Sequence, residues 1–138
     1  MGLILDSSVV IAAERRGATV RQLLEHVMDT AGDQDAALST VGVTDLIHGI
    51  HRAQSPEVKS RRQAFIAELL ADVAAYPYTL RAALMAGRID DEQKAHGVSV
   101  PFADLLIGAT ALSLGFGVLT TNPRHFRLIP GLGVTELS

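Results

Sequence analysis

The stretch LILDSSVVIAAERRG, residues 3–17, places an aspartate directly after a short aliphatic run. Residues 2–5, GLIL, have the length and apolar character of a buried strand, and Asp6, Ser7 and Ser8 follow them. An aspartate in this place has two interpretations. It caps the helix that follows, or it supplies one carboxylate of a metal site.

Composition limits the class of protein. The chain has 138 residues, 48% of them hydrophobic, which suits a single domain over residues 1–138 with a sizeable core. The chain has no cysteine, which excludes disulfides, thiolate nucleophiles and cysteine-based zinc sites. A net charge of −3 argues against a protein that simply coats nucleic acid. We see no secretory leader and no apolar run near the roughly 20 residues of a membrane span, and so expect a soluble cytoplasmic protein without membrane association.

Short apolar runs alternate with helical patterns along the chain. Strands are expected at residues 2–5, 36–39, 75–77, 117–121 and 133–137, and helices at 18–30, from an N-cap at Thr40 through Gly49, at 55–73, at 79–95 and at 99–116. The clearest helix start is at Ser55, where Pro56 suits the first helical position and Glu57 complements the helix dipole. This alternation predicts an α/β fold, a three-layer α/β/α sandwich around a short, mainly parallel sheet of four to five strands.

Four polar residues stand in or beside apolar stretches. Asp6 and Asn122 each follow a predicted strand, and the carboxyl ends of parallel strands are where ligands bind in such folds. Asp45 lies in VGVTDLIHGI and Asp104 in SVPFADLLIGATALSLGF. A charge in such surroundings is costly unless it is paired, hydrogen-bonded or bound to metal.

Each of these residues also has an ordinary structural explanation. Asp104 lies near the start of a predicted helix, where a carboxylate favours the helix dipole, and taken alone that explanation is the better one. Asp45 can pair with His48 or Arg52, and Asn122 has the character of a turn residue. Their joint placement at strand ends and helix N-termini is what favours a shared site.

Three carboxylates in one pocket repel one another, and the sequence offers no obvious buried lysine or arginine beside each of them. Mg²⁺ or Mn²⁺ relieves such repulsion, because these hard cations take oxygen ligands. A site of this kind suits phosphodiester hydrolysis by a metal-activated water.

Three blocks of the chain, in this order, carry a family resemblance: LILDSSVVIAAERRG, VTDLIHGI and PFADLLIGATALSLGFGVLTTNPRHFRLIPGL. They resemble the PIN domain and, more narrowly, the VapC-type toxins of bacterial toxin–antitoxin pairs, over nearly the whole chain. The resemblance implies a Mg²⁺- or Mn²⁺-dependent endoribonuclease with RNA as its substrate. It also implies a small VapB-like antitoxin as partner and a homodimer.

The resemblance assigns the site residues position by position. Asp6 matches the family's opening acid, and Asp104 in DLLIGA matches the third acid. Asp45 stands where the family usually carries glutamate, so it would reach the metal directly or through a water molecule. Asn122 matches a fourth acidic position without its charge, which implies weak binding of a second metal, or one metal with Asn122 orienting water or substrate.

Neighbouring residues complete the expected site. Ser7 and Ser8 match small hydroxyl positions of the family, and Thr120 and Thr121 are expected to support the site from the strand before Asn122. Candidate contacts to RNA phosphates are Arg15, Arg16, Arg124, His125 and Arg127. A solvated turn explains the last three about equally well.

Three other interpretations of these residues compete with a metal-dependent ribonuclease. A phospho-receiver or phosphatase also places an aspartate at a strand end, but DSS lacks the second aspartate of an Asp-x-Asp phosphatase. A zinc site is not favoured, because His48 and His51 have no third partner at ligand spacing. A catalytically weakened PIN domain that only binds RNA or protein stays an alternative, since Asp45 and Asn122 depart from the family pattern.

Overall fold

The computed structural model describes residues 1–138 and contains one sheet of five strands in the order β3-β2-β1-β4-β5. The strands are β1 (Gly2–Leu5), β2 (Asp35–Ser39), β3 (Ala74–Tyr76), β4 (Gly117–Thr120) and β5 (Val134–Glu136). All four neighbouring pairs are parallel. Their carboxyl ends therefore meet at one edge of the sheet, with β1 at its centre.

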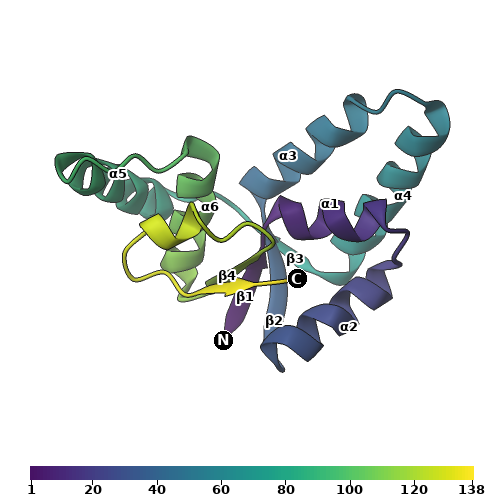
Figure 1. Cartoon of the computed structure of the whole chain (residues 1–138), viewed down its shortest axis with the longest axis horizontal. Coiled ribbons are helices and arrows are strands. Elements are labelled where there is room, and N and C mark those ends of the chain that lie inside the picture. The colour runs from purple at the N-terminus through teal and green to yellow at the C-terminus, as the bar shows by residue number, and fades with distance from the viewer.

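Six α-helices cover the sheet. They are α1 (Ser7–Arg15), α2 (Val20–Ala31), α3 (Thr40–His51), α4 (Pro56–Asp72), α5 (Leu80–Ala95) and α6 (Phe102–Leu114), and a short 3₁₀ helix, η1 (Phe126–Leu128), follows β4. Figure 1 shows α1 to α4 gathered on one side of the sheet and α5 with α6 on the other. The expected three-layer α/β sandwich is confirmed. No helix in it has the length and apolar character needed to cross a membrane.

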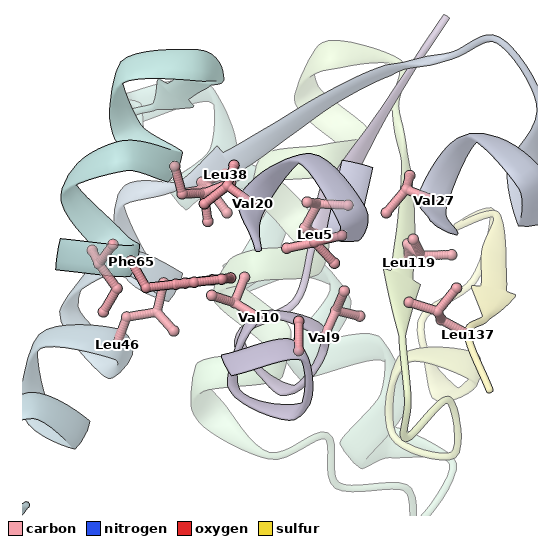
Figure 2. Packing of buried hydrophobic residues seen from close by; sticks show 14 of the residues in the cluster. Leu5, Val9, Val10, Val20, Val27, Leu38, Leu46, Phe65, Leu119 and Leu137 are labelled. Carbon is pink, nitrogen blue, oxygen red and sulfur yellow. The ribbon is translucent and has the colours of Figure 1, made fainter. Parts of the chain in front are cut away.

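Two hydrophobic clusters fill the space on either side of the sheet. Strand β1 contributes to both, because alternate residues of a strand point to opposite faces: Leu3 and Leu5 join one cluster and Ile4 the other. The first cluster also takes Leu119 from β4 and Val9 from α1, which Figure 2 shows close to Leu5. The start of α1 is thus fixed against the ends of the two central strands.

The start of α3 and both ends of α6 differ from the sequence-based prediction. The N-cap of α3 is Ser39 and not Thr40, because the Ser39 hydroxyl accepts the Gly42 N–H at 3.0 Å, whereas the Thr40 hydroxyl accepts the Tyr78 N–H at 3.3 Å. Helix α6 occupies residues 102–114 and not 99–116. Pro101 stands at its N-cap, and Gly115 ends it with a left-handed φ of 70°.

Candidate active site

Asp6 lies at the junction of β1 and α1, where the sheet edge meets the helix. It occupies the N-cap position of α1, yet its side chain makes no capping hydrogen bond. Its Oδ2 instead accepts hydrogen bonds from the hydroxyls of Ser8, at 2.7 Å, and Thr120, at 2.9 Å. The capping explanation for this carboxylate is therefore wrong, because its hydrogen bonds come from two side-chain hydroxyls and none comes from a backbone N–H of the helix.

Asp45 approaches the same region from α3. The Ser7 hydroxyl donates to its Oδ2 at 2.7 Å and so links the first turn of α1 to α3. The pairing of Asp45 with His48 or Arg52 that sequence spacing allowed is absent. The two consecutive serines after Asp6 thus support two different carboxylates.

The segment after β4 closes this network on its other side. The Thr120 hydroxyl accepts the Asn122 N–H at 3.0 Å, and the Ser8 hydroxyl accepts the Thr121 N–H at 3.2 Å. Asn122 is exposed, and its side-chain amide bonds none of the three carboxylates. The structure therefore brings the Asn122 backbone to the site and leaves its side chain in solvent.

Asp104 lies half-buried in the first turn of α6. Burial and the negative charge of Asp6 raise the pKa of this carboxyl above its usual value, and Asp45 adds a smaller effect of the same sign. The imidazole of His125 lowers the pKa in part, since its Nδ1 lies 3.1 Å from Oδ2. Asp6 and Asp45 therefore lie close enough to Asp104 for their negative charges to disfavour its ionised form.

The donor chemistry of this region fits a hard divalent cation. In each of the three aspartates the side-chain hydrogen bonds use Oδ2 alone, so Oδ1 has no protein donor. No buried polar side-chain atom lacks a partner, so these free oxygens are open to solvent. No three acidic or histidine side chains converge closely enough to hold an ion as they stand. A bound cation would thus require the carboxylates to rotate toward it.

The predicted phosphate contacts fall into separate places. Arg15 lines a hollow together with Asp45, whereas Arg16 lies 3.4 Å from His26 Nδ1 and lines a different one. Two further candidates are exposed and form no ion pair: Arg124 in the turn after β4 and Arg127 in η1. The five candidates thus do not form one continuous patch with the carboxylates.

Two side-chain contacts near the aspartates were not predicted from the sequence. The contact of His125 with Asp104 joins residues 21 positions apart, and no local pattern signals it. Glu14, buried at 6% exposure, receives Arg61 Nε at 3.0 Å and Arg62 Nε at 3.4 Å and so ties α1 to α4. A glutamate on the apolar face of a helix was the available signal for this second contact, since a buried carboxylate needs partners.

The model of the PIN domain matches residues 3–132. Among curated proteins, ribonuclease VapC1 of Rickettsia felis is 28% identical over 138 residues, which covers 100% of this chain and 98% of that protein. The tRNA(fMet)-specific endonuclease VapC of Shigella flexneri is 31% identical over 136 residues, 98% of this chain and 97% of that protein.

Solved structures with the same fold include complexes. A chain of VapBC2 from Rickettsia felis bound to a promoter DNA fragment superposes with a TM-score of 0.84 at 19% identity, with full coverage of both chains. A chain of DNA-bound VapBC from Salmonella typhimurium gives a TM-score of 0.83 at 22% identity and covers 100% of this chain and 99% of that one. At such identities these likenesses establish the fold.

Proposed function

This chain belongs to the PIN-domain family, with VapC proteins among its full-length relatives, and from that premise we propose that it is an endoribonuclease, the toxin of a toxin–antitoxin pair, dependent on Mg²⁺ or Mn²⁺. One observation supports it above the others: Asp6, Asp45 and Asp104 face one region, each with a free oxygen. Relatives named ribonuclease and tRNA endonuclease support RNA as substrate.

The proposed metal ligands are Asp6 and Asp104, with Asp45 bound directly or through water. A bound Mg²⁺ or Mn²⁺ supplies a Lewis acid for the phosphoryl oxygen and a nucleophilic water near neutral pH. Asn122, which is uncharged and exposed, is assigned to orienting water or substrate.

The remaining residues hold these carboxylates in position. Hydroxyls of Ser8 and Thr120 restrain Oδ2 of Asp6 and leave Oδ1 without a protein donor. Ser7 does the same for Asp45. Thr121 is assigned a supporting role through its N–H bond to Ser8. Such outer contacts orient metal ligands and sustain metal affinity.

The proposed partners follow from the relatives. Chains of the same fold are found in VapBC complexes, which supports a VapB-like antitoxin here. We further assign to this protein a homodimeric state and a cytoplasmic location. RNA phosphates would contact Arg15, Arg16, Arg124, His125 and Arg127.

Cleavage assays on the purified full-length chain, freed of antitoxin, test the proposal. We expect cleavage of labelled RNA with Mg²⁺ or Mn²⁺ and none with EDTA. Asp6→Asn and Asp104→Asn should each lower the rate by more than about 100-fold, because loss of a ligand exceeds the roughly 10- to 100-fold cost of losing an outer contact.

Asp91→Asn is the matched control, because Asp91 is exposed on α5 and has no hydrogen-bond partner. It removes the same charge and should leave the rate unchanged. Parent-like cleavage by Asp6→Asn would show that the site is assigned wrongly.

A second candidate function is a weakened PIN domain that binds RNA or protein without cleavage. It is favoured by the lack of charge at Asn122 and by the absence of three acidic side chains already converged on one point. Calorimetry decides between the two functions, since absence of Mn²⁺ binding at millimolar concentration supports the binding module.

A further inference from the structure

A hollow of about 500 Å³ opens beside Asp45, between α1, α3 and α4. These three helices lie together on one side of the sheet, away from α5 (Figure 1). The walls of the hollow carry three arginines, Arg15 from α1, Arg52 at the end of α3 and Arg62 from α4. The hollow thus places three positively charged side chains beside the Asp45 carboxylate.

The three arginines differ in how firmly they are held. Arg62 is fixed, because its Nε lies 3.4 Å from Glu14 Oε2 and its Nη1 donates to the Gly49 carbonyl at 3.0 Å. Arg15 and Arg52 are exposed, and their guanidinium groups make neither a hydrogen bond nor an ion pair. Two free guanidinium groups thus stand beside a third that the fold holds in place.

No acidic side chain in the wall neutralises the two free arginines. Asp45, the one carboxylate that lines this hollow, is bonded by Ser7 and forms no ion pair with either of them. Glu14, just beyond, is already shared by Arg61 and Arg62. The hollow therefore has an uncompensated positive charge directly next to the negative site.

Charge and position identify the occupant that fits. A guanidinium group binds phosphate through two parallel hydrogen bonds, and phosphate contacts fix the register of a nucleic acid strand. The hollow adjoins an apolar one where Val10, Leu46 and Phe65 point toward one another (Figure 2). Free arginines beside a cleavage site match a phosphodiester that continues away from the cleaved bond.

We propose that Arg15, Arg52 and Arg62 form a phosphate subsite that binds the RNA backbone on the α3–α4 side of the cleaved bond. The inference rests on the proposed ribonuclease function and adds the path of the substrate to it. Arg62 supplies a fixed contact and the other two close on the phosphate.

The test uses the double variant Arg15→Gln/Arg52→Gln, which keeps Arg62 because Arg62 also holds Glu14. Arg88→Gln is the control, because Arg88 is equally exposed and unpaired but lies on α5. Binding of a fluorescein-labelled single-stranded RNA of mixed sequence is measured by anisotropy without divalent metal over a range of salt concentrations. Cleavage of the same RNA is measured with Mg²⁺, and melting curves check the fold.

We expect the double variant to bind RNA about tenfold more weakly and to raise KM in proportion, with kcat within about twofold of the parent. The slope of log affinity against log salt should decrease by about 1.4, since each phosphate contact on a single strand contributes roughly 0.7. Arg88→Gln should match the parent in every measurement.

Unchanged RNA binding in the double variant overturns the subsite. Unchanged RNA binding together with weaker retention of an antitoxin encoded beside the chain identifies the hollow as a protein-docking surface and also overturns it. If the parent cleaves RNA and the double variant behaves like Arg88→Gln, the subsite is wrong and the ribonuclease function stands. If the parent cleaves no RNA but binds it more tightly than the double variant does, the arginines bind RNA and the ribonuclease function is wrong.

Discussion

Asp6 and Asp104 face the same region and are supported in contrasting ways. Asp6 is buried just after the central strand β1 and receives two hydroxyl donors, one from α1 and one from β4. Asp104 is half-buried at the start of α6 and has one partner, the imidazole of His125 in the turn after β4. Neutral hydroxyl groups hold Asp6, whereas Asp104 is held by an imidazole, a group that can carry charge.

The contrast separates what orients the carboxylate of Asp6 from what determines the ionisation of Asp104. Two short hydrogen bonds, from Ser8 of α1 and Thr120 of β4, fix the orientation of the Asp6 carboxylate. Asp104 carries the electrostatic cost of the site, since burial and the neighbouring carboxylates raise its pKa. We therefore expect variants around Asp6 to disturb geometry, and variants around Asp104 to change how strongly the site depends on pH and on a bound cation.

Thr120→Val should give the largest effect among these contacts. Thr120 is fully buried and donates to Asp6, so its loss leaves Oδ2 held by Ser8 alone and loosens the orientation of the carboxylate. We expect Mn²⁺ affinity to fall by about 10- to 100-fold, the usual cost of losing an outer contact, and stability to fall by about 1–3 kcal/mol. Calorimetry and urea unfolding measure the two changes.

Thr110→Val is the matched control for that variant. Thr110 is also fully buried, but its hydroxyl donates to the Leu106 carbonyl within α6. Its replacement should leave Mn²⁺ affinity unchanged. Equal losses of affinity in the two variants would contradict the role given to Thr120.

His125→Ala should have an intermediate effect, focused on Asp104. The imidazole lowers the pKa of Asp104, so its removal should raise that pKa further and move the acid limit of Mn²⁺ binding to higher pH. We expect roughly a tenfold loss of affinity at mildly acidic pH. Carbon-13 NMR of the Asp104 carboxyl follows the titration in the metal-free protein.

His125→Asn separates this interpretation from a packing effect, because its amide nitrogen stands near the place of Nδ1 and keeps a donor for Asp104. It should restore most of the parent titration. A shared shift in both variants would show that the hydrogen bond is not the cause.

Asp104→Asn should give the smallest effect, on the pH dependence of stability without metal. The folded-state pKa of Asp104 is raised above its ordinary value of 3.8, so the folded chain binds more protons than the unfolded chain between the two pKa values. Stability of the parent therefore falls as pH rises through that window, and the loss is complete above the folded-state pKa.

Asp104→Asn removes that loss, so the variant should be more stable than the parent at neutral pH and equal to it below 3.8. Urea unfolding from acid to neutral pH measures the difference, with Asp91→Asn as the exposed control. A variant that is less stable than the parent at neutral pH would show that repulsion among the aspartates is not the dominant effect.

Much of this architecture was predictable from local patterns. The strand at residues 2–5, the helix start at Pro56 and the parallel α/β class follow from apolar runs, capping residues and alternation, which act over a few neighbours. The wrong prediction of Thr40 as the N-cap of α3 also concerns neighbouring residues. Two adjacent hydroxyl residues compete for one cap, and the backbone around β3 decides which is free.

The sequence by itself determined that an aspartate follows the first strand and that Asp104 stands at the start of a helix, whereas Asp45 lies in the second turn of α3 and not at its start. Only the tertiary structure decided what each carboxylate binds. Thr120 lies 114 residues from Asp6, Ser7 lies 38 from Asp45, and His125 lies 21 from Asp104. Such contacts depend on how strands and helices pack, and one residue type in one local pattern serves equally well as a cap, a charge partner or a ligand.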